Sequence, residues 1–291
     1  MEISAKILTP EDVVLSRNID DYPEGIIIPI DKPYRWTSAD VIRKVKFAAI
    51  RHFGKKNLKV GHAGTLDPLA TGVLLVCIGK ATKLAEWLQS HHKEYVAGIT
   101  FGATTPSYDL EKEIDRFFPF KHITSESVAS ALPSFIGEQD QIAPLFSAKS
   151  VDGVRAYELA RKLHKEGKTL DEVAKELIRV SRINITELEL MTFDEASDNV
   201  GGVVSHPSSS DASSRIKVTD NSALGLPRAV IRMACSKGTY VRAFARDLGE
   251  ALGSGAHLDS LQRSGSGIFR VKNSLTVDQV ITLLTAWQTN A

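Results

Sequence analysis

The 291-residue chain has only two cysteines, Cys77 and Cys235, and they lie far apart in apolar or small-residue surroundings. This excludes a disulfide framework, and we expect two reduced, buried thiols in a cytoplasmic protein. No window approaches the roughly 20 apolar residues that a membrane-spanning helix needs. The first thirty residues also lack the basic start and apolar stretch of a signal peptide. The sequence therefore predicts a cytoplasmic globular protein without a membrane anchor.

Net charge is also nearly absent, because 36 Lys and Arg face 35 Asp and Glu and leave +1. That total alone argues against a nucleic-acid partner. The charge is unevenly distributed, however. Residues 31–93 hold twelve basic and four acidic side chains, and residues 232–272 hold seven basic and three acidic ones. If the two stretches lie side by side, they form a positive face suited to phosphates. The alternative is a solvated, lysine-rich helix surface.

The order of the predicted short strands and helices indicates the fold class. Their order lacks strict strand–helix alternation, which favours an α+β fold with a mixed, largely antiparallel central sheet and flanking helices. Residues 1–24 form an N-terminal extension to one large domain, 25–291. Residues 196–228 carry eight serines and no aromatic residue, which indicates a flexible insertion. We expect strands at 25–30, 73–78, 94–101, 180–193 and 229–234, and helices at 39–53, 81–88, 124–136, 155–164 and 240–252.

A glycine-rich loop at residues 61–72, GHAGTLDPLATG, runs directly into a predicted buried strand. It carries His62 and Asp67, and Pro68 biases Asp67 away from helical dihedral angles. A carboxylate fixed on such a loop can act as a nucleophile, a general base or a metal ligand. The alternative is a structural turn in which the Asp67 side chain bonds to its own backbone.

Residues 234–258 form a second segment that contains candidate catalytic residues. We expect a strand to end near Lys237 and Thr239 to cap a helix that presents Arg242 near its start, next to Tyr240. The alternative is a surface arginine paired with a nearby acid of the same helix.

A third segment begins at Tyr95, on the predicted strand 94–101. An aromatic side chain there serves either the core or base stacking.

Common cofactor motifs are missing. The chain has no GxGxxG after a strand, no GxxxxGK[ST], no HExxH and no GxSxG. The His91-His92 pair has no partner at metal-ligand spacing. Nucleotide-cofactor, zinc and serine-hydrolase interpretations therefore lose support.

Five ordered blocks resemble the TruB family of tRNA pseudouridine synthases, which isomerise uridine in the TΨC arm of tRNA. GHAGTLDPLATGVLLVCIGKATKL and CSKGTYVRAFARDLGEALGSGAHLDSLQR are the specific blocks, while short matches such as DKP or SAK carry little weight. The other three are GIIIPIDKPYRWTS, KEYVAGITFGATTPSYD and QIAPLFSAKSVDGVRAYELAR. The resemblance implies the pseudouridine synthase fold, tRNA as partner through its T-arm stem-loop, and no metal or organic cofactor. We expect a monomer.

The resemblance also implies roles for individual residues. Asp67 matches the catalytic aspartate, Arg242 the arginine that pairs with it, and Tyr95 the tyrosine that stacks on the flipped base and takes part in proton transfer. His62 matches a histidine that helps to hold the flipped-out loop. The remaining substrate-binding positions are two base-pocket contacts, Tyr240 and Leu261, and two structural or phosphate-contacting lysines, Lys32 and Lys83.

The chemistry agrees with these roles, because a base inside a folded loop must be flipped out and restacked before its glycosidic bond can react. A bidentate Arg242 would keep Asp67 ionised. Whether Asp67 attacks the uracil or the sugar, or acts through a glycal, stays open. An RNA-binding module without catalysis is the second hypothesis, and an aspartate-nucleophile hydrolase is the third.

The chain departs from the family pattern at Arg35, where relatives have glycine, so we expect the local turn to differ. It also stops about twenty residues after residues 267–270, whereas many relatives continue into a C-terminal PUA domain. We therefore expect a short form of the enzyme without that domain.

Overall fold

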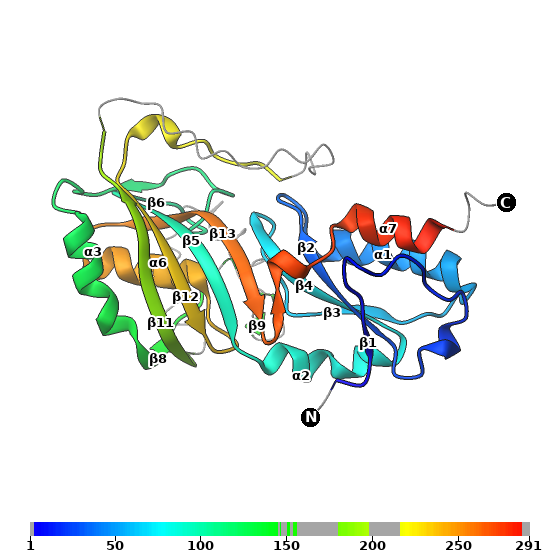
Figure 1. The fold of residues 1–291 in the computed structure, drawn as a ribbon. Helices are drawn as coiled ribbons and strands as arrows, with labels where there is room; N and C mark the ends of the chain where they lie inside the picture. Colours follow the sequence, from blue (N-terminus) through cyan, green and yellow to red (C-terminus); the bar gives the residue numbers. More distant parts are fainter. Residues whose placement is uncertain are drawn as a thin grey trace. The chain divides into compact units, whose positions relative to one another are not determined.

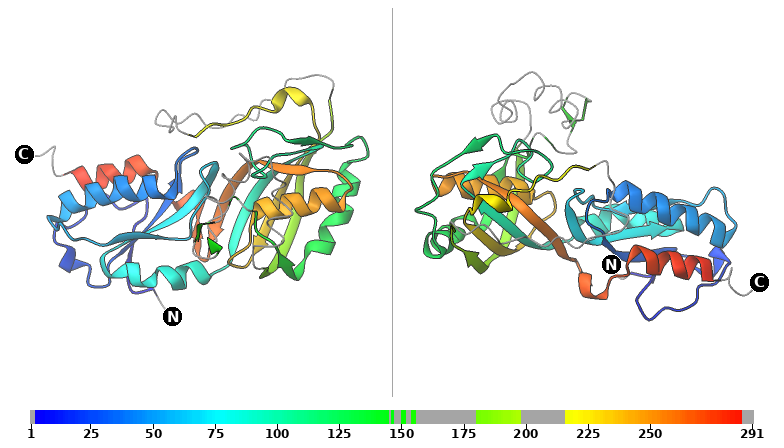
Figure 2. Two further views of the ribbon diagram at one scale, coloured as in Figure 1. Left: turned by 180° about the vertical axis from the view of Figure 1, so that it is seen from behind. Right: turned by 90° about the horizontal axis from the view of Figure 1, so that it is seen from above.

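The computed structural model describes residues 3–144, 146, 150–151, 154–155, 180–197 and 216–286. Contacts divide them into two units (Figures 1 and 2). The first unit comprises residues 3–94 and 262–286, and the second the remaining described residues up to 261. Strands β5 (Lys93–Phe101) and β13 (Ala256–Ser266) each begin in one unit and end in the other.

The first unit is built on a mixed sheet in which β1, β2, β4 and the end of β13 are successive neighbours. The pair β1/β2 is parallel, and β2/β4 is antiparallel. Two further strands join this sheet in antiparallel fashion, β3 against β4 and β14 against β13. The strands are β1 (Lys6–Ile7), β2 (Ile26–Lys32), β3 (Val60–Ala63), β4 (Ala70–Ile78) and β14 (Phe269–Arg270).

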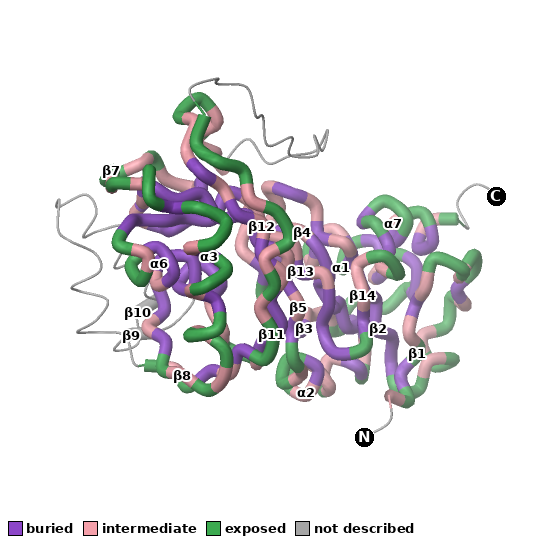
Figure 3. The backbone as a smooth tube through the Cα atoms, turned by 60° about the vertical axis from the view of Figure 1, so that its left-hand side comes forward, coloured by how far each residue is buried: buried purple, intermediate pink, exposed green. Residues whose placement is uncertain are grey.

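Strand β4 is buried on both faces, as its continuous apolar run predicts (Figure 3). Val73, Leu75 and Cys77 pack in one cluster with Leu88 of α2 (Ala85–Ser90). Successive side chains of a strand point to opposite faces, so the intervening residues of β4 lie on the other face of the sheet.

Helices α1 (Ser38–Phe53) and α7 (Val277–Thr285) pack together in this unit. The ring of His52 is hydrogen-bonded through Nδ1 to Leu284 O at 3.1 Å. Thr37 is the N-cap of α1 and forms a capping box with Asp40, and Ser38 is the first helical residue. Because Thr37 makes the capping bonds, the Ser38 side chain is not used to cap α1.

The second unit continues from the start of β13 through β5, β12, β11 and β8, and the pairs β11/β12 and β11/β8 are antiparallel. Helix α6 begins after β12, and the ring of Phe244 on this helix meets Phe135 edge to face at 5.4 Å. The elements are β12 (Arg228–Cys235), β11 (Ser181–Asp194), β8 (Gly137–Gln141), α6 (Val241–Ala251), α3 (Ser125–Ala131) and the 3₁₀ helix η3 (Leu132–Phe135).

Short elements complete the two units. They are the 3₁₀ helices η1 (Ile19–Asp21), η2 (Gly79–Leu84), η4 (Ser222–Leu224) and η5 (Val271–Asn273), and the strands β6 (Ala103–Thr104), β7 (Arg116–Phe117), β9 (Ser150–Val151) and β10 (Val154–Arg155).

The mixed, largely antiparallel sheet with flanking helices confirms the predicted α+β class. The helix expected at 81–88 begins as the 3₁₀ helix η2 and continues as α2. The helix expected at 155–164 lies almost wholly outside the described residues, as does 198–215 of the expected insertion. Residues 216–228 of that insertion are docked, because Thr219 N donates to Leu110 O at 2.8 Å.

Cys77 and Cys235 are buried thiols that are not joined in a disulfide, and burial raises the pKa of Cys77 to about 12. Among the described residues, no helix has both the length and the apolar character required to cross a membrane.

Candidate active site

The loop between β3 and β4 holds Asp67 in a tight backbone turn. Ala70 N donates to Asp67 O at 3.1 Å, and Pro68 occupies the second position, where its fixed φ suits such a turn. The Asp67 side chain is half-buried. A backbone hydrogen bond therefore closes the turn that carries Asp67.

Buried side chains fix the residues on both sides of Asp67. Ser38 Oγ accepts from Leu66 N at 3.0 Å and donates to Leu66 O at 3.2 Å. Lys32 Nζ donates to Pro68 O at 3.1 Å and also to the carbonyls of Pro33 and Trp36. The peptide groups before and after Asp67 are thus anchored to the segment that joins β2 to α1.

The two ends of the loop are held in the same way. Arg263, which is 2% exposed, donates from Nη2 to Gly64 O at 3.0 Å and from Nε to Val73 O at 2.7 Å. Gly72 N donates to Asp31 Oδ1 at 3.0 Å. Gly72 has a φ of +95°, and a Cβ there would lie 2.2 Å from Arg263 O, so only glycine fits. The loop is consequently rigid on the side that carries Asp67.

The electrostatic surroundings of Asp67 include a buried cation. Burial lowers the pKa of Lys32 to about 7, and the positive charge of Arg263 acts in the same direction, while the negative charge of Asp67 opposes both. Lys32 therefore interacts electrostatically with the Asp67 carboxylate as well as bonding to the adjacent carbonyl. This gives Lys32 a structural role beneath the loop.

His62 lies on β3, five residues before Asp67. Burial, followed by the positive charge of Arg263, lowers the pKa of His62, so its ring is neutral at pH 7. Its Nδ1 is buried and has no hydrogen-bond partner within the part of the chain that the structure describes. A neutral imidazole with an unused nitrogen is suited to contact with a substrate.

In the second unit, Arg242 is buried near the start of α6 and is only 5% exposed, so the surface-arginine alternative is wrong. Its Nη1 donates to Ser107 O at 3.1 Å and to Phe146 O at 2.8 Å, and its Nε lies 3.7 Å from Asp109 Oδ2. Asp109 is thus a carboxylate that holds this guanidinium within its own unit. The pairing of Arg242 with Asp67 stays a prediction.

Tyr240 is the N-cap of α6, in place of the predicted Thr239, and makes no side-chain capping bond. The Gln141 side chain fixes its backbone instead, because Tyr240 N donates to Gln141 Oε1 at 2.8 Å and Gln141 Nε2 donates to Tyr240 O at 3.2 Å. Leu261 is half-buried on β13, and Tyr95 is 9% exposed on β5. Their roles in substrate binding stay predictions.

Lys83 lies away from Asp67. It is an exposed residue of η2 and lines a pocket at the far end of β4, so the structure separates it from Lys32, which supports the loop. Of the two lysines, only Lys32 contacts the segment that carries the aspartate.

Comparison with known proteins identifies the family. The chain matches the TruB family pseudouridylate synthase N-terminal domain over residues 51–200 and the tRNA pseudouridylate synthase B C-terminal domain over residues 242–291. tRNA pseudouridine synthase B of Phocaeicola vulgatus is 46% identical over 258 residues, which cover 89% of this chain and 92% of that protein. The chain belongs to the TruB family.

A second relative within the TruB family, tRNA pseudouridine synthase B of Flavobacterium johnsoniae, is 39% identical over 89% of this chain and 95% of its own length. Among solved structures, a Cbf5-Nop10-Gar1 complex contains a chain with a TM-score of 0.59 and 22% identity. The similarity covers 97% of this chain and 62% of that one, and it supports the same fold. A chain of an H/ACA RNP bound to a substrate RNA containing 2'-deoxyuridine gives a TM-score of 0.56 at 19% identity and covers 100% of this chain and 67% of its own.

The sequence does not reveal the residues that hold the candidate groups within each unit. Arg263 holds the Asp67 loop, Asp109 holds Arg242, and Gln141 holds Tyr240, and in each case the partner is far away in the chain. Arg35, which stands where relatives have glycine, adopts φ of +62°, the left-handed conformation that glycine favours, and such strain costs about 1 kcal/mol. That the turn differs from that of relatives stays a prediction.

Proposed function

We propose that this TruB-family enzyme converts uridine to pseudouridine at position 55 in the TΨC loop of tRNA and that Asp67 is its essential catalytic group. The observation that carries the proposal is the fixed Asp67 loop. Three buried side chains, Lys32, Ser38 and Arg263, and the half-buried Asp31 hold its backbone. A catalytic group needs such preorganisation, because loss of position costs rate directly.

The isomerisation conserves all atoms of the nucleoside. The bond from C1′ to N1 breaks, the uracil turns, and a bond from C1′ to C5 forms, while C5 loses a proton and N1 gains one. Asp67 is the group that assists the breaking and forming of the bonds at the sugar and base. The reaction transfers no electrons to another molecule and therefore needs no redox partner.

The target base is flipped out of the T-arm loop before it reacts. In this proposal, Tyr95 supplies the stacking surface that the base loses, and Tyr240 and Leu261 complete the base pocket. The unused Nδ1 of His62 hydrogen-bonds to the displaced RNA. Arg242, held by Asp109, is in this proposal the cation that pairs with the Asp67 carboxylate once the RNA is bound.

The proposal is tested by tritium release from 5-tritiated uridine in a T-arm stem-loop, since the C5 proton leaves only when the isomerisation occurs. Asp67→Asn is expected to lower the rate by at least about a thousandfold with an unchanged circular dichroism spectrum. The exposed Asp278→Asn serves as the matched control and should react like wild type. Near-normal release by folded Asp67→Asn would refute the catalytic role. Wild-type protein that binds the stem-loop without tritium release would support the non-catalytic RNA-binding module instead.

A further inference from the structure

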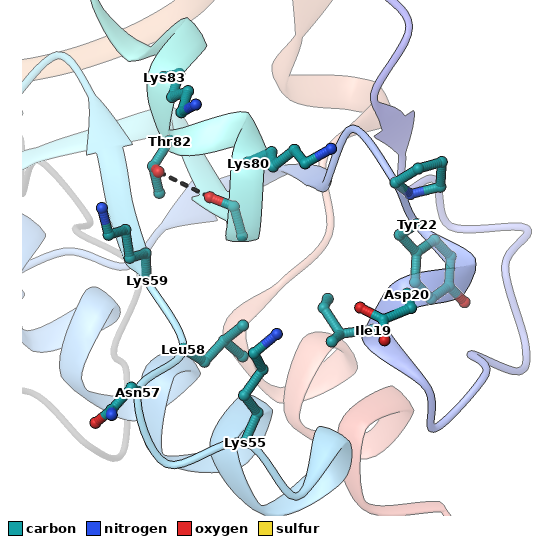
Figure 4. A pocket seen from close by; sticks show the side chains of 12 residues that line it. Ile19, Asp20, Tyr22, Lys55, Asn57, Leu58, Lys59, Lys80, Thr82 and Lys83 are labelled. Atoms are coloured by element: carbon teal, nitrogen blue, oxygen red, sulfur yellow. Dashed lines mark hydrogen bonds between the residues drawn. The ribbon is translucent and has the colours of Figure 1, made fainter.

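The first unit contains a pocket that the proposed chemistry does not use (Figure 4). Its cavity of about 530 Å³ lies between η1, the segment that follows α1, and η2. Four lysines from two separate segments line it, Lys55, Lys59, Lys80 and Lys83, together with the single acid Asp20. The formal charge of the lining is therefore +3.

All four lysines are exposed. Lys80 pairs with Glu24 at 3.8 Å. Within the described part of the chain, no carboxylate forms an ion pair with Lys55, Lys59 or Lys83. Like charges gathered around one cavity repel each other, and a bound anion relieves that repulsion. The pocket is thus suited to a negatively charged ligand.

The pocket and Asp67 lie at opposite ends of β4. Ala70, the first residue of the strand, is bonded to Asp67 O, and the strand ends at Ile78, next to the pocket-lining Gly79. Eight steps along a strand span about 26 Å. A group bound in the pocket is therefore distant from the reacting base.

The form of the pocket indicates the kind of anion. Exposed lysines are mobile point charges that contact phosphates without a fixed geometry, whereas a small anion is usually held by buried donors or backbone amides. The same positive stretch of sequence, residues 31–93, contains the Asp67 loop and all four pocket lysines. We propose that this lysine pocket is a second RNA-binding site, which takes backbone phosphates of the tRNA at a distance from the T-arm loop. The inference rests on the proposed function, in that tRNA is the substrate.

The test compares two RNAs and two double variants. In this proposal, full-length tRNA reaches both ends of β4, whereas the stem of a stem-loop with about four base pairs is only about 14 Å long. Lys55→Glu with Lys59→Glu reverses two charges in the pocket. Lys46→Glu with Lys272→Glu reverses two exposed charges of the same unit outside it and is the matched control.

Filter binding over a range of salt concentrations provides the readout. We expect the pocket variant to bind full-length tRNA about five- to tenfold more weakly, with a salt slope smaller by about 1–2, and to bind the short stem-loop like wild type. The control variant should retain wild-type affinity for both RNAs. Unchanged tRNA affinity of the pocket variant, or an equal loss for both RNAs, would overturn the proposal. If inorganic phosphate binds wild type but not the pocket variant while tRNA affinity is unchanged, the pocket is a small-anion site and the proposal fails.

Failure of this inference is separable from failure of the proposed function. The binding assay needs no turnover, and wild-type tritium release is measured on the same RNAs. Tritium release without a pocket effect would leave the catalytic proposal intact and remove only the second site.

Discussion

The two ends of strand β4 differ in how the protein treats polar groups. At the Asp67 end, Lys32, Ser38 and Arg263 are buried, and each is hydrogen-bonded to backbone atoms of the loop or its flanking strand. At the pocket end, four lysines are exposed, and only one forms an ion pair with a described acid. The backbone of the Asp67 loop is thus held in a fixed geometry, whereas the pocket end concentrates positive charge.

The two proposals give this difference a physical reason. If Asp67 breaks a bond, its carboxylate has to lie within a fraction of an ångström of its target, and the buried hydrogen bonds of the loop position it. Binding of RNA phosphates requires positive potential, which falls off slowly and tolerates side-chain motion. Substitutions at the Asp67 end should therefore affect stability and turnover, and substitutions at the pocket end should affect affinity and its salt dependence.

The largest stability effect is expected at Arg263, whose side chain is 2% exposed. Arg263→Met leaves Gly64 O and Val73 O without their donor and should lower the free energy of unfolding by about 3–4 kcal/mol. Urea unfolding measures the change. The exposed Arg51→Met is the control and should stay within about 0.5 kcal/mol of wild type. Equal effects of the two substitutions would contradict the claim that the buried hydrogen bonds of Arg263 stabilise the Asp67 end.

A smaller effect with a sharper signature is expected at Ser38. Ser38→Ala removes both hydrogen bonds to Leu66 and should cost about 1–2 kcal/mol of stability. Because the residue before Asp67 is then less fixed, kcat should fall about tenfold, while KM for tRNA changes little. Steady-state tritium release separates the two constants. Ser90→Ala removes an exposed hydroxyl in the same unit and should change neither. A rise in KM alone would assign Ser38 to binding.

Expressed per pH unit, the smallest effect is expected from the titration of Lys32. Its pKa is about 7 in the folded protein and 10.5 in an unfolded chain, so between these values the unfolded state holds more protons. The free energy of unfolding of wild type relative to Lys32→Met should therefore rise with pH, by up to about 1.4 kcal/mol per pH unit between pH 7 and 10. Urea unfolding at pH 7, 8 and 9 tests this, with the exposed Lys46→Met as control. A pH-independent difference would show that Lys32 keeps its ordinary pKa.

The sequence predicted the elements whose apolar residues recur with a clear period, and it predicted the Asp67 loop from its high glycine content. The apolar run of β4, the basic helix α1 and the glycine-rich Asp67 loop were all recognised from local patterns. The anchoring of that loop was not predictable, because Ser38 meets Leu66 across 28 residues and Arg263 meets Gly64 across 199. The lysine pocket was not predictable for the same reason, since its lysines line the cavity together with Asp20 and Tyr22 from the segment before β2.

The central claim is that Asp67 performs the chemistry while the far end of β4 only holds RNA. Single-turnover formation of pseudouridine in saturating full-length tRNA tests it most directly. Asp67→Asn should bind tRNA like wild type and form no product. Lys55→Glu with Lys59→Glu should form product at the wild-type rate once enough enzyme is added to saturate the weaker complex. Product formation by Asp67→Asn, or a slow rate at saturation in the lysine variant, would contradict this division of roles.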